Sequence, residues 1–182
     1  FSPGASVLMG DFWLASAINL IVSHKCDYRI ISLFSQTIED LAEGEMLQMQ
    51  RADDCTTTFD DYTAIIYRKT ASLFISSMCT VAVAEGASKE VEEGIRKFAH
   101  CLGISFQMRD DILDYSATIQ DGKDVGSDLA ERKITLPLLC AFENCPEKEG
   151  YIRSLIRDID VTKGADQTRN TEIIKEVRQY VL

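Results

Sequence analysis

Apolar and polar side chains recur with a helical period along nearly the whole chain, and no segment alternates in the way that marks a half-buried strand. The pattern predicts helices whose approximate ranges are 5–23, 27–50, 59–85, 88–116, 128–143, 147–158 and 169–181. Segment 117–127 is rich in aspartate and glycine and is expected to be a loop. We therefore predict an all-α helical bundle in which residues 1–182 form a single domain.

Two stretches, 64–84 and 98–115, are apolar around most of the helix circumference. Such helices belong in the middle of a bundle rather than on its surface. Gly44 and Gly103 also lie inside predicted helices, where glycine costs about 1 kcal/mol relative to alanine. Close approach of a neighbouring helix, or access for a ligand, would offset that cost.

The composition is that of a soluble globular protein, with 46% hydrophobic and 26% charged residues. A formal net charge of −10 argues against a nucleic-acid surface, which needs a basic stripe. No uninterrupted apolar run reaches the roughly 18 residues of a membrane span, and no signal peptide is recognisable, so we expect no stable membrane insertion. The six cysteines lack zinc-site spacing, which indicates reduced thiols and a cytoplasmic protein. Because the chain begins with Phe1 rather than methionine, we expect its N-terminal region to be missing.

The segment Gln107–Asp114 (QMRDDILD) carries the most informative candidate chemistry. On a helix, Gln107, Asp110, Asp111 and Asp114 fall within roughly a 100° arc. Carboxylates that close repel one another, and they are costly to desolvate in a bundle interior. A divalent cation relieves both problems, and Mg²⁺ commonly uses one or two carboxylates together with substrate phosphate oxygens.

The residues that flank this motif favour a metal site over a solvated acidic helix face. Leu102, Phe106 and Leu113 lie on the opposite side of the same helix and are expected to pack inward. For the motif taken alone, the solvated face stays open as the alternative.

Lys69-Thr70 stands in the middle of the largely apolar stretch Tyr62–Ala84. A lysine there is unfavourable unless its ammonium group finds an anion or reaches the surface. Taken alone, Lys69 is explained by a side chain that extends to the surface. Beside a carboxylate and metal site, the same lysine becomes a natural phosphate ligand.

A third candidate comprises Gly122–Asp128 and the following segment Arg132–Pro137, which together contain Lys123 and Lys133. Glycines, two lysines and a helix N-terminus are consistent with an anion-binding lid, although most such loops are solvated turns. The three candidates together would let an acidic protein hold a diphosphate, with Mg²⁺ bridging carboxylate to phosphate and lysines completing the shell.

Several segments in a fixed order carry a resemblance to a known family. They are Ser6–Phe12 (SVLMGDF), Glu43–Gln48 (EGEMLQ), Lys69–Leu73 (KTASL), Gln107–Asp114, Gly122–Asp128 (GKDVGSD) and Lys133–Pro137 (KITLP). In these segments the chain resembles the trans-polyprenyl diphosphate synthases. The resemblance spans residues 6 to about 143 and implies a prenyl synthase-type bundle around a central cavity, of which this chain would be the larger, C-terminal part.

The resemblance also implies a reaction and its ligands. A Mg²⁺-dependent enzyme of this kind condenses isopentenyl diphosphate with an allylic prenyl diphosphate to make a longer polyprenyl diphosphate, and its usual state is a homodimer. Magnesium would be bound by Asp110 and Asp114, with Asp111 and Asp128 acting directly or through metal-bound water. The roles nearest the substrate would fall to Lys69, Lys123 and Lys133 at the leaving diphosphate, and to Thr70 and Gln107 near the reacting carbons.

The chain departs from the family pattern in three ways. Asp124 and Arg132 stand where proline and glycine are usual. The first aspartate-rich motif, expected just before Ser6, is absent, so we expect the chain alone to be inactive.

Other functions were weighed against the synthase. A non-catalytic regulatory subunit of a heteromeric synthase has no chemical need for an intact DDxxD motif with Lys69 and Lys133. A class I terpene cyclase shares the ionisation chemistry but does not account for the Lys-Thr and Lys-x-Thr-Leu-Pro segments. An acidic helical scaffold leaves the whole ordered set of motifs unexplained. The motif spacing resembles that of long-chain enzymes that make quinone side chains.

Overall fold

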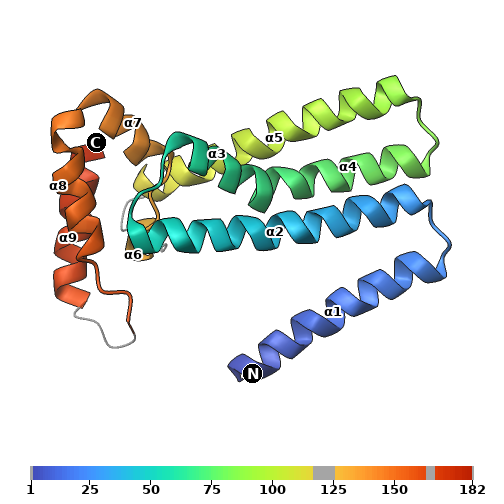
Figure 1. The fold of residues 1–182 in the computed structure, drawn as a ribbon, viewed down its shortest axis with the longest axis horizontal. Coiled ribbons are helices and arrows are strands. Elements are labelled where there is room, and N and C mark those ends of the chain that lie inside the picture. Colours follow the sequence, from blue (N-terminus) through green and yellow to red (C-terminus); the bar gives the residue numbers. More distant parts are fainter. Residues whose placement is uncertain (1, 117–125, 163–166, 182) are drawn as a thin grey trace.

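The computed structural model describes residues 2–116, 126–162 and 167–181, and in these ranges every regular element is a helix (Figure 1). The elements are α1 (Pro3–Ser23), α2 (Tyr28–Asp54), α3 (Phe59–Ile66), η1 (Tyr67–Ala71), α4 (Ser72–Ala84), α5 (Lys89–Ser116), α6 (Ser127–Ala130), α7 (Leu136–Asn144), α8 (Pro146–Arg157) and α9 (Gln167–Val181). The prediction of an all-α fold is confirmed.

The helices α2, α4 and α5 pack along the long axis of the molecule, while α7, α8 and α9 gather at one end (Figure 1). Helix α1 runs antiparallel to α2 and diverges from it toward the N-terminus (Figure 1). The last turns of α2, the start of α3 and the last turns of α5 meet α6 and α7 at the end of the bundle (Figure 1). The candidate site lies at this meeting point.

The predicted helix 59–85 is interrupted in its middle. A capping box at Thr58, whose side chain and backbone pair with Asp61, starts α3. The helix then widens into the single π turn η1 before continuing as α4. A π turn accommodates an extra residue without ending the helix, and the apolar pattern resumes in α4, so the sequence predicts one uninterrupted element.

The predicted helix 128–143 consists of two short helices, α6 and α7, instead of one. Between them Arg132 adopts a left-handed conformation with φ 58°, which no α-helix contains. Pro137 stands in the first turn of α7, where its missing N–H costs no hydrogen bond. The break turns residues 131–135 into a connecting segment that passes beside α2.

The main core fills the end of the molecule where α7, α8 and α9 pack. Its fully buried aliphatic members are Leu129, Leu138, Ile156, Ile159 and Val177. Tyr62 and Tyr115 belong to the same core and connect it to α3 and α5. A smaller cluster of Ile75, Cys79 and Ala99 joins α4 to α5. The site therefore adjoins the larger of the two hydrophobic clusters.

Helix α5 faces the opposite way from our prediction. Leu102, Phe106 and Leu113 were expected to pack inward, but their exposed fractions are 41%, 56% and 46%. The reason is that the face carrying Gly103 and Asp111 is turned toward η1 and α3, and both residues are buried there. Asp111 thus lies on the inner face of α5, while Asp114 is half-buried and Asp110 is exposed.

Helix α1 has no buried residue. By length and composition it is apolar enough to cross a membrane, although the sequence contains no uninterrupted apolar run of that length. The expectation of no stable membrane insertion stays a prediction. Asp11 is the only charged residue of α1, and one charge does not make a helix of this length polar. Helices from the core of soluble proteins satisfy the same criterion.

Candidate active site

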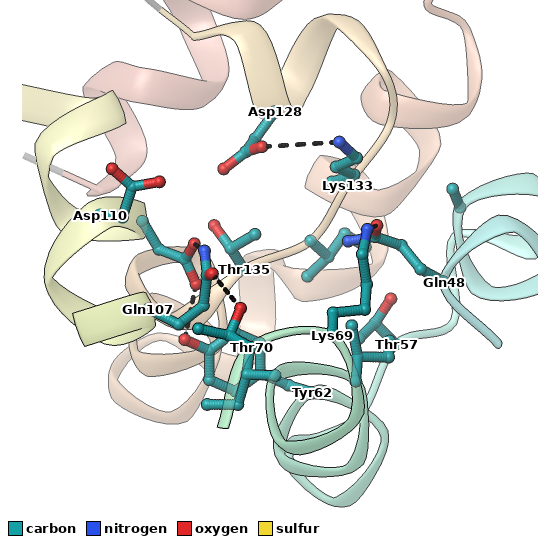
Figure 2. Close-up of a pocket in the computed structure, with 15 residues that line it drawn as sticks. Gln48, Thr57, Tyr62, Lys69, Thr70, Gln107, Asp110, Asp128, Lys133 and Thr135 are labelled. Carbon is teal, nitrogen blue, oxygen red and sulfur yellow. Dashed lines mark hydrogen bonds and ion pairs between the residues drawn. The ribbon is translucent and has the colours of Figure 1, made fainter. Parts of the chain in front are cut away.

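A cavity of about 260 Å³ opens where α2, α3, η1, α5 and the segment from α6 to α7 converge (Figure 2). Its wall is built from Ala52, Ile65, Ile66 and Ile134. The polar residues that line it are Gln48, Thr57, Tyr62, Lys69, Thr70, Gln107, Asp110, Asp111, Asp128, Lys133 and Thr135. Two lysines and three aspartates share this small space, a composition that suits an anionic ligand bound together with a cation.

The π turn η1 supplies two adjacent side chains that reach in opposite directions. Lys69 Nζ lies 2.5 Å from Glu45 Oε2 and also donates a hydrogen bond to Gln48 Oε1, both on α2. Thr70 Oγ1 donates a 2.7 Å hydrogen bond to Gln107 Oε1 on α5. The turn therefore connects the two helices that flank the cavity.

Asp111 is the best-fixed carboxylate of the DDxxD motif and is only 4% exposed. Its Oδ2 accepts a 2.6 Å hydrogen bond from the Tyr62 hydroxyl, and its Oδ1 accepts a 2.9 Å bond from Gln107 Nε2. Burial raises the pKa of Asp111, the two hydrogen bonds lower it, and the neighbouring carboxylates raise it again. The net result is a pKa above the ordinary value.

The other two carboxylates of the motif have different surroundings. Asp110 is exposed at the edge of the cavity (Figure 2). Asp114 Oδ1 accepts hydrogen bonds from the backbone N–H and the hydroxyl of Ser127, at 3.1 and 2.8 Å. Its Oδ2 accepts a longer bond from the Asp128 backbone at 3.3 Å. Asp114 thus lies beside the cavity and ties α5 to the start of α6.

Asp128 on α6 and Lys133 in the segment between α6 and α7 face the cavity (Figure 2). Burial and the charges of Asp114 and Asp111 raise the pKa of Asp128 to about 6. Lys133 Nζ lies 4.0 Å from Asp128 Oδ1 and 2.5 Å from Glu131 Oε2. Burial lowers the pKa of Lys133, but the two carboxylates raise it by more. The net pKa lies above the ordinary value, so the lysine keeps its charge.

The structure brings most of the sequence-predicted site residues to this one cavity: Lys69, Thr70, Gln107, Lys133, Asp110, Asp111 and Asp128. Asp114 lies next to it without lining it. Lys123 falls outside the residues that the structure describes. The catalytic and metal-binding roles assigned to all of these residues stay predictions.

Sequence reasoning did not assign roles to Tyr62, Gln48, Thr57 or Thr135, which also line the cavity. A signal was present for Tyr62, because it precedes Lys69 by two helical turns and so lies on the same face. Gln48 and Thr135 lie in segments that resemble the family, but an uncharged amide or hydroxyl does not by itself imply a site role. Thr57 precedes α3 in a turn and gave no signal.

The side chains that line the cavity suit a metal ion and a diphosphate, because the aspartates supply oxygen ligands and the lysines supply positive charge. Within the part of the chain that the structure describes, no three carboxylate, histidine or cysteine side chains form a group that could hold a metal ion. Magnesium does not need such a group, since it commonly binds one or two carboxylates and takes its other oxygens from phosphate and water. The buried Thr135 hydroxyl lines the same cavity, with the Tyr115 hydroxyl as its neighbour.

Comparison with known proteins places these residues in a family context. The family model described as polyprenyl synthetase matches residues 1–177. The octaprenyl diphosphate synthase of Escherichia coli is 38% identical over 158 residues, which are 86% of this chain and 49% of that relative. The chain thus spans about half the length of the curated relatives that it matches.

Solved structures show the same similarity. Heptaprenyl diphosphate synthase from Staphylococcus aureus superposes with a TM-score of 0.83 and 29% identity, covering 100% of this chain and 56% of that one. A polyprenyl synthase from Caulobacter crescentus, complexed with calcium and isoprenyl diphosphate, has a TM-score of 0.81 and 31% identity and covers 98% and 52% of the two chains. The likeness extends over the whole helical arrangement, including the elements that build the cavity.

Proposed function

Because the chain belongs to the polyprenyl synthetase family, we propose that the protein is a Mg²⁺-dependent trans-prenyltransferase. It condenses isopentenyl diphosphate with an allylic prenyl diphosphate and releases a longer polyprenyl diphosphate and inorganic diphosphate. The observation that carries this proposal is the convergence of Lys69 and Lys133 with Asp110, Asp111 and Asp128 on one cavity. An acidic protein needs such a mixed set of charges to bind a diphosphate.

The lysines bind and stabilise the leaving group. Lys69 and Lys133 each rest against a glutamate, Glu45 and Glu131, at 2.5 Å. A diphosphate oxygen replaces these carboxylates when the substrate arrives, and the lysines then neutralise the charge that grows as the allylic carbon–oxygen bond breaks. The bonding electrons leave with the diphosphate.

Magnesium, when bound, shields the negative charge of the diphosphate and polarises its oxygens. Asp110, exposed at the cavity edge, and Asp128, whose half-buried carboxylate lies near the carboxylates of Asp114 and Asp111, are the residues best placed to hold it. Asp111 and Asp114 support them from positions fixed by hydrogen bonds.

The carbon chemistry takes place on the other side of the diphosphate. Thr70 and Gln107 form a hydrogen-bonded pair near the allylic carbon and hold that side of the cavity in shape. The double bond of isopentenyl diphosphate attacks the allylic cation, and the loss of one proton from the new chain completes the condensation. The apolar wall of Ile65 and Ile66 keeps water away from the cation.

We further propose that the product is a long-chain polyprenyl diphosphate and that the protein works as a cytoplasmic homodimer without stable membrane insertion. Relatives named as octaprenyl and heptaprenyl diphosphate synthases support the product class. Exposed apolar side chains on α1 and α5, such as Trp13 and Phe106, support further packing partners.

A product assay tests the proposed function. The complete gene product is incubated with farnesyl diphosphate, isopentenyl diphosphate and Mg²⁺, and the product masses are read. A ladder that ends at a defined length is expected. Tight binding to a second synthase chain without elongation would instead support a regulatory subunit, and a cyclic hydrocarbon product would support a terpene cyclase.

A further inference from the structure

The π turn η1 lies between two glycines that come from different helices. Gly44 on α2 and Gly103 on α5 are both buried, and each is in close contact with residues of η1. The other glycines within helices behave differently, because a Cβ added to them would meet nothing within 4 Å; they are Gly4, Gly10, Gly94 and Gly150. Among the glycines inside the described helices, close approach to another segment is thus confined to the two beside η1, while Gly126, which precedes α6, lies close to Ile174.

Gly44 allows Arg68 and Lys69, in the first half of the π turn, to lie against α2. A Cβ built on it would lie 2.8 Å from Arg68 Cβ and 2.9 Å from Lys69 Cγ. Both distances are shorter than any normal contact between carbon atoms. The Lys69 side chain could rotate to relieve its share of the clash, but it would then leave Glu45 and Gln48.

Gly103 allows Ala71, at the end of the π turn, to lie against α5. A Cβ on this residue would lie 2.6 Å from Ala71 Cα and 3.0 Å from Ala71 Cβ. The clash involves backbone, so no rotamer change removes it. Either η1 or α5 would have to move, and Thr70 and Gln107 would separate.

Each glycine is followed one helical turn later by a glutamine that contacts the same π turn. Gln48 accepts a hydrogen bond from Lys69, and Gln107 accepts one from Thr70. The spacing of four residues places each glycine and its glutamine on one face of a helix. The glycine therefore sets how near η1 lies, and the glutamine orients the side chain that η1 presents.

We propose that Gly44 and Gly103 are positioning residues that seat the π turn between α2 and α5, so that Lys69 and Thr70 reach the cavity together. Glycine has a low helix propensity, but at both sites a larger residue would push η1 away. This inference rests on the proposed function, since it takes Lys69 as a ligand of the diphosphate.

Alanine substitution in the complete gene product tests the proposal, with Gly150→Ala in α8 as the matched control. We would measure the Kd of inorganic diphosphate in the presence of Mg²⁺ by calorimetry, kcat and KM for prenyl transfer, and the Tm. Gly44→Ala should raise the Kd about tenfold, because it displaces a charged hydrogen-bond donor. Gly103→Ala should lower kcat about 100-fold through misplacement of Thr70 and Gln107. Gly150→Ala should change neither the Kd of diphosphate nor kcat.

The combination of readouts separates positioning from folding. A positioning role predicts weak binding or slow turnover in variants whose Tm stays near that of the control. If Gly103→Ala fails to fold, Gly44→Ala decides alone, because its clash is the milder one: its shortest contact is 2.8 Å to Arg68 Cβ, whereas a Cβ on Gly103 would lie 2.6 Å from the Ala71 backbone. Variants that bind and react like the control would overturn the inference.

The proposed function and this inference can fail separately. If the unaltered protein binds diphosphate but transfers no prenyl group, the proposed function is wrong while the Kd of the variants still tests the glycines. If the unaltered protein binds no diphosphate, both are wrong.

Discussion

The Tyr62 hydroxyl on α3 donates a 2.6 Å hydrogen bond to Oδ2 of Asp111 on α5, in the interior of the molecule. Because Gln107 donates to the other carboxylate oxygen, both oxygens of Asp111 are held by protein groups. The central carboxylate of the DDxxD motif is thus oriented before any ligand arrives. This arrangement makes Tyr62 part of the site although it carries no charge.

Tyr62→Phe should remove this hydrogen bond while changing the packed volume little. A buried carboxylate that loses a donor is destabilising, so we expect the free energy of unfolding to fall by about 1–3 kcal/mol. The Mg²⁺ concentration needed for half-maximal activity should rise, because Asp111 becomes less well oriented. Urea unfolding and a Mg²⁺ titration of activity measure the two effects. Tyr28→Phe, at a residue that is 77% exposed, serves as control, and equal behaviour of the two variants would contradict the role of Tyr62.

Asp110→Asn in the complete protein should lower turnover by about 100-fold or more, since it removes charge at the proposed metal site. The fold should remain, because Asp110 is exposed. Steady-state kinetics at several Mg²⁺ concentrations, with a Tm for each variant, would check this. Asp54→Asn, at an exposed position of α2, is the control. Unchanged activity with the same Mg²⁺ dependence would show that Asp110 is not a metal ligand.

The stability of the metal-free protein should depend on pH through Asp128. Its pKa is raised from 3.8 to about 6 in the folded state, so the folded protein binds this proton more tightly than the unfolded chain does. Stability from this group is therefore greatest below pH 3.8 and is lost as the pH rises to about 6, by an amount on the order of 3 kcal/mol.

Asp128→Asn isolates that contribution from the titration of other carboxylates. In the presence of a chelator, the variant should gain stability relative to the unaltered protein as the pH rises from about 4 to about 7. Urea unfolding at a series of pH values gives the difference directly. A difference that does not vary with pH would show that the pKa of Asp128 is not raised.

Arg132 combines an unfavourable backbone conformation with a favourable side-chain contact. Its φ of 58° would suit glycine, but its guanidinium group donates two hydrogen bonds to the Ile159 carbonyl, at 2.5 and 2.8 Å. Arg132→Ala should therefore lose about 1.5–3 kcal/mol of stability. Arg132→Gly should lose about 1 kcal/mol less, because glycine adopts this conformation without strain. Chemical unfolding distinguishes the two, and equal losses would mean that the backbone conformation contributes nothing.

The candidate site could be predicted largely because its residues are polar or charged within apolar helices. Lys69 and the aspartates stand out against their neighbours, and the helical period predicts which of them share a face. What the period cannot predict is which neighbour that face meets. Leu102 and Phe106 were expected to be buried, yet the side of α5 that carries Asp111 is the inner one, because it contacts Tyr62 and η1.

Two local features were also beyond the reach of the pattern. The π turn contains Arg68, Lys69 and Thr70 but no proline or glycine, so nothing in the order of residues marks an interruption of the helix. The break at Arg132 depends on a left-handed residue that is not glycine, and a single arginine gives no warning of that conformation. In both cases the tertiary contacts made by the segment decide the local structure.

The unburied helix α1 carries the chain's only tryptophan, Trp13, with an exposed fraction of 68%. Indole fluorescence shifts to shorter wavelength when water is removed from the ring. The emission of Trp13 is therefore a built-in optical reporter of whether α1 is covered. A blue shift on assembly would follow the association in real time, without any added label.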